Sequence, residues 1–126
     1  MRFVNLALSP YGSYSYEKSS SIKMDILGLF LTSSVGYAPC SFREWGLTNR
    51  WENDETNGNV TALERNGDYI LLRDLFSDEE VPTVLKMTRE QYGQILTDWE
   101  EKVLKLKPKE VIITYENDQF VIETKD

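Results

Sequence analysis

The sequence predicts an α+β domain in which one long amphipathic helix packs on a face of an antiparallel sheet built from hairpins. Three features carry this prediction. Asn66-Gly67 separates two strand-like runs, Thr88 opens a helical pattern, and Asn117-Asp118 separates two further strand-like runs. The 126 residues suit a single domain that spans residues 1–126, and the 40% of hydrophobic residues suffice for one core.

The N-terminal part mixes clear and ambiguous patterns. Residues 2–8 predict a first strand, which Pro10 ends. In the Tyr- and Ser-rich segment that follows, Tyr14 and Tyr16 would share one face of a half-buried strand or loop. Residues 22–35 contain IKMDILGLFL, which fits a buried strand or a short helix, because periodicity does not separate the two over so short a run. We favour a strand followed by a turn.

The next segment predicts little regular structure. Residues 37–51 are expected to be irregular, apart from a helical turn at 41–45. Trp45 and Trp51 are expected to anchor the packing of this segment. Cys40, in APCSF, is expected to be a buried or partly buried small residue.

A hairpin is predicted around Asn66-Gly67. Both residues tolerate positive φ, which a type I′ turn requires, so residues 60–65 and 68–75 should pair as antiparallel strands. Residues 77–80 then predict a turn and residues 81–87 a further strand.

The helix that follows has a clear beginning and end. Thr88 and Gln91 have the spacing of a capping box, and Lys107-Pro108 stops the helical pattern. The run EVIITYENDQFVIETK then predicts a second hairpin around Asn117-Asp118. The apolar face of the predicted helix consists of Tyr92, Ile95, Leu96, Trp99, Val103 and Leu106.

The stretch NDETNGNVTALE has the spacing of a twelve-residue calcium loop. It runs from Asn53 to Glu64, with Gly58 at the sixth position and Glu64 at the bidentate twelfth. However, Asn53 replaces the usual Asp, and Asn66-Gly67 interrupts the chain where the second helix of an EF-hand would continue. We therefore expect an exposed acidic connection between strands and no metal site.

Acidic charge is concentrated in one segment. The net charge is -7, and residues 44–80 contain ten acidic and three basic residues, so this segment carries the whole imbalance. Such a chain repels phosphate backbones, which argues against nucleic-acid binding. A localised acidic field attracts cations or basic proteins. The alternative interpretation is an ordinary solvated surface.

The sequence lacks the residue patterns of common catalytic sites. It has no histidine, a single cysteine and no glycine-rich phosphate-binding motif. These absences exclude Ser-His-Asp and Cys-His catalysis and cysteine- or histidine-based zinc sites. Asp and Glu are abundant enough for a carboxylate-pair hydrolase, but no pair stands out. The prediction is a protein that is not an enzyme and uses no cofactor.

The sequence predicts a cytoplasmic protein that does not enter a membrane. The apolar run near the N-terminus is too short for a signal peptide, and Tyr and Gly interrupt it. Residues 26–31 form an apolar run that is far too short to span a bilayer.

A small acidic protein without catalytic residues suggests a binder of something basic. Residues 61–124 resemble the C-terminal half of small immunity proteins of bacterial polymorphic and contact-dependent growth-inhibition toxin systems. The resemblance rests on the order of a hairpin (ALERNGDYILLRDLF), a strand (VPTVLKM), a capped helix (TREQYGQILTDWEEKVLKL) and a hairpin (EVIITYENDQFVIET). It implies a cytoplasmic inhibitor that binds a cognate, basic toxin such as a nuclease. Because these families share no catalytic motif, it transfers no functional residue.

Charge and expected loop placement select the candidate partner-binding residues. They are Trp51, Glu52, Asp54, Glu55, Asp78, Glu79 and Glu80. Two other functions remain open. One is a non-enzymatic adaptor or regulatory subunit, and the other is a small-ligand module that uses Tyr14, Tyr16 and the Trp residues.

Overall fold

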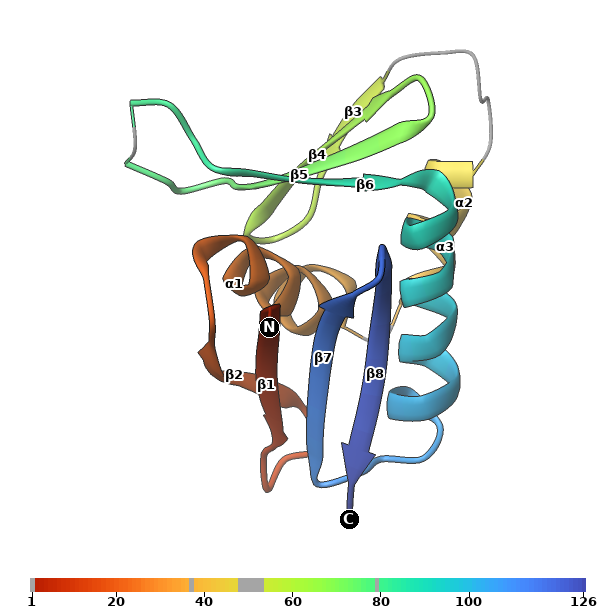
Figure 1. Cartoon of the computed structure of the whole chain (residues 1–126). Helices are drawn as coiled ribbons and strands as arrows, with labels where there is room; N and C mark the ends of the chain where they lie inside the picture. Colours follow the sequence, from red (N-terminus) through yellow and green to blue (C-terminus); the bar gives the residue numbers. More distant parts are fainter. Residues whose placement is uncertain (1, 37, 48–53, 79) are drawn as a thin grey trace.

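The computed structural model describes residues 2–36, 38–47, 54–78 and 80–126. Within these residues, two antiparallel four-stranded sheets enclose helical segments (Figure 1). We call the sheet with strand order β2-β1-β7-β8 sheet A, and the sheet with order β3-β4-β5-β6 sheet B. The α+β class is therefore confirmed, although the strands form two sheets where the sequence predicted one.

Sheet A places the first and last strands of the chain together. β1 (Arg2–Leu8), as predicted, pairs with β2 (Tyr14–Ser19) and with β7 (Glu110–Glu116). β7 and β8 (Gln119–Lys125) form the predicted second hairpin. Its turn residues Asn117 and Asp118 have φ of 52° and 60°, as a type I′ turn requires.

Sheet B contains the predicted first hairpin, formed by β4 (Thr61–Asn66) and β5 (Tyr69–Asp74). Its turn lies one residue later than predicted, because Asn66 pairs with Tyr69. Of the two turn residues Gly67 and Asp68, only Gly67 has positive φ, at 61°. This pattern is that of a type II′ turn, which places Gly first. The outer strands are β3 (Asp54–Asn57) and β6 (Val84–Thr88), and β6 starts later than the predicted strand.

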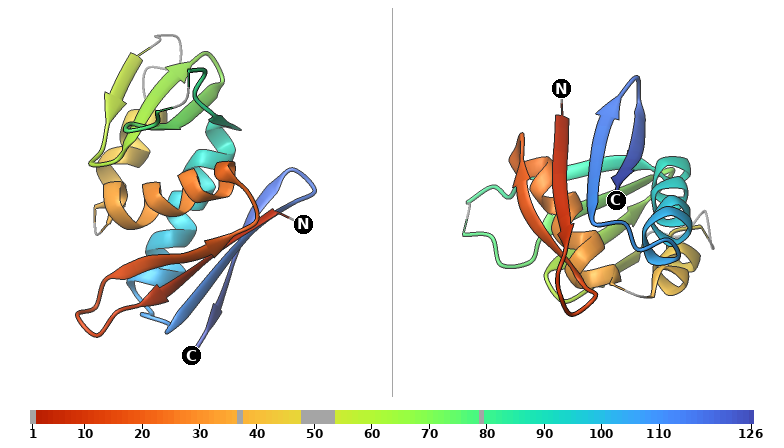
Figure 2. Two further views of the ribbon diagram at one scale, coloured as in Figure 1. Left: turned by 90° about the vertical axis from the view of Figure 1, so that its left-hand side faces the viewer. Right: turned by 90° about the horizontal axis from the view of Figure 1, so that it is seen from below.

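The predicted strand in residues 22–35 is wrong. This segment is α1 (Ile22–Leu29), which continues as a π-helical turn, η1 (Phe30–Val35). Ser21 caps α1 by accepting a hydrogen bond from the Met24 amide at 3.3 Å. The helix lies between the sheets, packed against β1 and β2 on one side and β5 and β6 on the other (Figures 1 and 2). Because two sides of the helix are buried, its exposed stripe is narrow, and its sequence shows no clear helical period.

Residues 39–47 also form more helix than predicted. α2 (Pro39–Leu47) packs against α3 (Arg89–Asp98), where the predicted irregular segment had a single turn. Trp45 packs on the core as expected, whereas Cys40 is exposed and its predicted burial is wrong. Trp51 lies outside the described residues.

The capped helix after β6 begins at the predicted residue. Thr88 Oγ1 accepts from the Gln91 amide at 3.0 Å, and Gln91 Oε1 accepts from the Thr88 amide at 2.8 Å, so the capping box is complete. α3 continues as a second π-helical turn, η2 (Trp99–Leu104), so the predicted long helix is two consecutive segments. The predicted apolar face is buried except at its last member, Leu106.

One hydrophobic cluster runs through both sheets and the helices between them. Tyr14 belongs to it: its ring meets Trp99 edge-on at 5.8 Å, and its hydroxyl donates to the carbonyl of Pro108. Tyr16, on the same strand, is 40% exposed. Of the two tyrosines, only Tyr16 therefore has an exposed ring.

Candidate partner-binding surface

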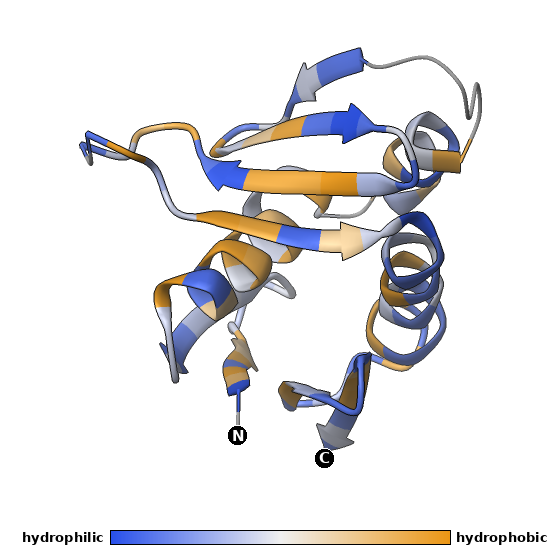
Figure 3. Cartoon of the chain, turned by 45° about the horizontal axis from the view of Figure 1, so that its top comes forward, coloured by the Kyte–Doolittle hydropathy of each residue, from blue (hydrophilic) through white to orange (hydrophobic). Residues whose placement is uncertain are grey.

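The connection between β5 and β6 projects away from sheet B (Figure 1). We call the described residues of this connection, 75–78 and 80–83, the arm. Phe76 is 70% exposed and Val81 is 82% exposed, and the exposed acidic residues Asp78 and Glu80 lie between them. Figure 3 shows this alternation of hydrophobic and hydrophilic segments along the arm. The arm therefore presents apolar and acidic side chains together on one protrusion.

This combination differs from an ordinary exposed surface. Single exposed apolar residues are normal, but several on one protrusion expose apolar area that a binding partner can bury. Aromatic side chains are enriched at protein interfaces, and acidic groups beside them speed the approach of a basic partner. At the root of the arm, the Phe76 amide donates to Asp74 Oδ1 and the Leu75 amide donates to the Val60 carbonyl, each at 2.9 Å.

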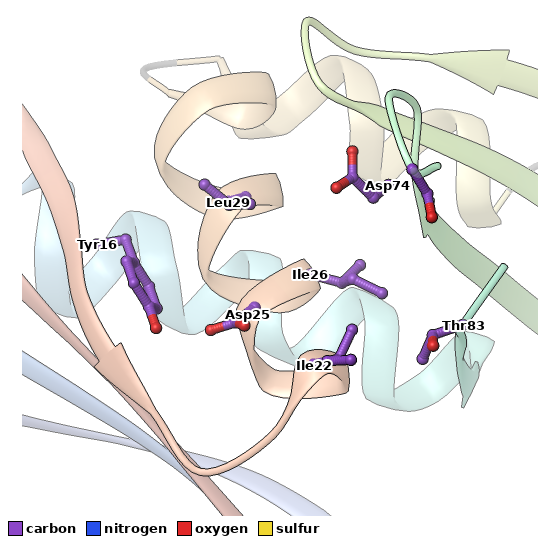
Figure 4. Close-up of a pocket in the computed structure, with 8 residues that line it drawn as sticks. Tyr16, Ile22, Asp25, Ile26, Leu29, Asp74 and Thr83 are labelled. Atoms are coloured by element: carbon purple, nitrogen blue, oxygen red, sulfur yellow. The ribbon is translucent and has the colours of Figure 1, made fainter. Parts of the chain in front are cut away.

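A hollow of about 200 Å³ lies at the root of the arm (Figure 4). We call it the basal pocket. In Figure 4, α1 supplies Ile22, Asp25, Ile26 and Leu29, with Tyr16 of β2 to one side and Asp74 and Thr83 to the other. Ser77 of the arm completes the lining. Segments from three distant parts of the sequence therefore form one hollow next to the arm.

Two carboxylates line the basal pocket. The Ser19 hydroxyl donates to Asp25 Oδ1, and the amide of Phe76 donates to Asp74 Oδ1. Within the described part of the chain, no Lys or Arg forms an ion pair with Asp25 or Asp74. The pocket therefore combines an apolar wall with negative charge that no ion pair within these residues balances.

Asp54, a predicted partner-binding residue, has a structural role. Its Oδ2 accepts from Trp45 Nε1 at 3.0 Å and lies 3.7 Å from Arg65 Nη2. Arg65 is 3% exposed, stacks 5.2 Å from the Trp45 ring centre and donates to the Trp45 carbonyl. The Trp45 hydrogen bond, followed by a backbone hydrogen bond and Arg65, lowers the pKa of Asp54 below its ordinary value. Asp54 therefore helps to hold α2 against sheet B.

The predicted acidic residues do not form one patch. Asp54 pairs with Arg65, next to the β4–β5 turn, whereas the arm leaves the opposite end of β5 after Asp74. Glu55 is exposed on the edge strand β3, directly across from Glu64. Asp78 and Glu80 are exposed on the arm. The other three predicted residues, Trp51, Glu52 and Glu79, lie outside the described residues.

Sequence reasoning missed the apolar half of this surface. Phe76 was placed at the end of a hairpin, and Val81 was assigned to a strand whose pairing begins only at Val84. The available signal was LFSDEEVP, in which apolar residues flank an acidic turn without strand alternation. The basal pocket had no comparable signal, because Asp25 and Asp74 come to line the same hollow only through tertiary packing.

Two further hollows have a different character. A groove of about 810 Å³ runs between β6, α3 and the β7–β8 hairpin. Its lining includes Tyr69, Tyr115, several glutamines and charges of both signs, and Lys86 Nζ lies 4.0 Å from the Tyr69 ring centre. A smaller hollow of about 210 Å³ lies on sheet B beside Glu64 and Arg73. The groove is large enough for a small ligand.

The stretch that has the spacing of a calcium loop forms a β-hairpin from residue 54 onward. Residues 54–57 and 61–66 are the paired strands β3 and β4, where an EF-hand would need helices on both sides of its loop. Asn53, its first position, lies outside the described residues. Elsewhere among the described residues, no three Asp, Glu or Cys side chains gather closely enough to hold a metal ion.

Comparisons with protein-family models, with curated proteins and with solved structures found no match for this chain. Across the described residues, no helix has the length and apolar character needed to cross a membrane.

Proposed function

We propose that this protein is a non-catalytic inhibitor, an immunity protein of the bacterial cytoplasm, that neutralises a cognate basic toxin such as a nuclease by binding it through the arm. The observation that carries the proposal is the exposure of Phe76 and Val81 beside Asp78 and Glu80 on one projecting connection. Acidic side chains on such a protrusion attract a basic protein, and the apolar side chains become buried when it docks.

The composition supports a role in binding. The chain has no histidine and one cysteine, which removes the usual nucleophile and general-base pairs, and its net charge is -7. A toxin that acts on nucleic acid needs a cationic surface for phosphates. An acidic inhibitor can cover such a surface without any chemistry of its own.

The test begins with affinity capture of the tagged protein from the bacterium that makes it, with mass spectrometry of the retained polypeptides. We expect a near-stoichiometric basic polypeptide, or the C-terminal fragment of a large secreted protein, whose toxic activity is lost when the purified protein is added. Retained proteins of a single cellular pathway would instead support an adaptor or regulatory subunit.

Variants of the arm then locate the interface. Phe76→Ser and Val81→Ser should weaken the complex without changing the unfolding temperature, because both side chains are already in solvent. Tyr11→Ser and Leu106→Ser are matched controls, since these residues are 94% and 70% exposed and lie outside the arm. Equal affinity of all four variants and the wild type would contradict binding through the arm.

The groove beside α3 favours a second function, that of a small-ligand module. A melting-temperature screen with small ligands would test it. A ligand that stabilises the wild type, and does so less after Tyr69→Ala, would favour this function over toxin inhibition.

A further inference from the structure

We propose that the basal pocket is a specificity pocket for one basic side chain, a lysine or an arginine, of the bound partner. This inference rests on the proposed function, in which a basic protein docks on the arm. It specifies that one basic side chain of that protein is recognised and that the basal pocket binds it. Lysine and arginine side chains both consist of an alkyl chain that ends in a cation.

The apolar wall of the pocket suits the stem of such a side chain. Ile22, Ile26 and Leu29 follow one another at helical spacing, so they lie on one face of α1. Ile22 is 55% exposed, which leaves apolar area for a partner to cover. Lysine and arginine bury their methylene stems along apolar surfaces of this kind and keep the charged end in polar surroundings.

The carboxylates suit the charged end. Asp25 and Asp74 each accept one hydrogen bond through Oδ1, from the Ser19 hydroxyl and the Phe76 amide respectively. For neither carboxylate do the described residues supply a cation within ion-pair distance. An entering ammonium or guanidinium group would be their first ion-pair partner within this part of the structure. Charge-assisted hydrogen bonds of this type are among the stronger polar contacts in proteins.

The position of the pocket connects it to the arm. Ser77 and Thr83 belong to the arm, and Asp74 is the strand residue from which the arm leaves. A polypeptide bound along the arm as far as its root would therefore reach the basal pocket. Its volume of about 200 Å³ is below the roughly 300–1,000 Å³ of drug-sized ligand sites, which suits a single side chain.

The test uses the full-length protein and needs no partner. The probes are butylammonium and butylguanidinium, which represent the ends of lysine and arginine, with butanol and butyrate as neutral and anionic controls. Amide chemical shifts are followed by NMR as each probe is added at millimolar concentration. We expect only the two cations to shift the amide signals of Ile22, Asp25, Ile26 and Thr83. The cation that binds more tightly identifies whether the pocket prefers lysine or arginine.

Variants check the origin of the shifts. Asp25→Asn and Asp74→Asn keep side-chain size and should each weaken cation binding about tenfold. Glu123→Gln, which removes an exposed carboxylate on β8, should leave binding unchanged. A dispersed amide spectrum shows that each variant is folded, and either Asp variant suffices if the other unfolds.

Two results would overturn the inference. One is the absence of local shifts with either cation, and the other is equal shifts with butanol. Because neither experiment involves the toxin, such a failure would leave the arm-binding proposal standing. Conversely, capture could retain no basic partner while the cations still cause local shifts. The pocket would then bind cations, and the proposed function would be wrong.

Discussion

Asp54 and Arg65 face each other across the β3–β4 ladder, and both contact Trp45 of α2. Arg65 is a buried cation, so its charge needs a nearby acceptor and a carboxylate. Asp54 supplies the carboxylate, and the Trp45 carbonyl supplies the acceptor. A residue first selected as a partner-binding candidate is thus part of the contact between α2 and sheet B.

The first prediction is that Asp54→Asn lowers the stability of the fold at neutral pH. The Trp45 hydrogen bond and Arg65 hold the pKa of Asp54 below its ordinary value, so the ionised form is favoured in the folded state. This stabilisation is present above the ordinary carboxyl pKa of about 3.9 and disappears as the pH falls through the lower, folded value. Urea unfolding at several pH values should therefore show a wild-type advantage that shrinks in strong acid.

Glu123→Gln is the control for this experiment, because its carboxylate is exposed on β8. It should change the urea midpoint little at any pH. A gap between Asp54→Asn and the wild type that stays constant down to strong acid would show that the ionised carboxylate is not the stabilising group.

The second prediction concerns two glycines at the contact between α2 and α3. A Cβ at Gly46 would lie 2.3 Å from Cε2 of Tyr92, a ring that is fully buried and whose hydroxyl donates to the Phe42 carbonyl. Gly46→Ala should therefore destabilise the protein by roughly 1–3 kcal/mol, as overpacking of a core does. Calorimetry or urea unfolding would measure it.

Gly93→Ala is the matched change on the opposite helix. There a Cβ would meet Leu47 Cδ1 at 3.3 Å, and Leu47 is 47% exposed and can move aside. Alanine is favoured over glycine inside a helix by about 1 kcal/mol, so this variant should be neutral or slightly stabilised. If both variants lose the same stability, the close approach of Gly46 to Tyr92 is not the cause.

The third prediction is that Thr88→Ala costs about 1 kcal/mol of stability. The change removes the hydroxyl that accepts from the Gln91 amide and leaves the first turn of α3 without its cap. Thr88→Ser keeps the hydroxyl and should retain most of the stability. Thr124→Ala, at an exposed site on β8, should have a small effect. Equal losses for the alanine and serine variants at position 88 would rule out the cap as the cause.

Local signals in the sequence predict the elements that local chemistry determines. The Thr88–Gln91 box and the Asn117-Asp118 turn each depend on a few neighbouring residues, and both are confirmed. Residues 22–35 depend instead on burial between two sheets. That burial on two sides leaves the helix only a narrow polar strip, so its sequence resembles a strand, and the Ser21 cap was not recognised.

The candidate site was predictable only in part. Charge alone selects Asp78 and Glu80 as candidates, and both are exposed on the arm. The contact of Asp54 with Trp45 and Arg65 depends on the docking of α2, which no short-range pattern specifies. The basal pocket likewise needs β2, α1 and the arm to meet. The division of the strands into two sheets is also a long-range property.

The last prediction concerns the rate at which the proposed partner binds. Reversing Asp78 and Glu80 to lysine should slow association with a basic partner about tenfold at low ionic strength, because long-range attraction guides the encounter. Stopped-flow fluorescence at increasing salt would measure the rate. The difference from the wild type should disappear near 1 M salt, where the screening length falls to about 3 Å. Asp54 is unsuitable for this test, since its reversal would place a cation beside buried Arg65.

The control reverses Glu116 and Glu123, which are exposed in sheet A, and so changes the net charge by the same amount. If the acidic residues of the arm guide the encounter, this control variant should slow association much less than the arm variant does. If both double variants slow association equally, overall charge guides the encounter and the arm has no special part in it. If neither slows it at low salt, acidic steering is wrong, and the exposed Phe76 and Val81 alone would have to account for binding through the arm.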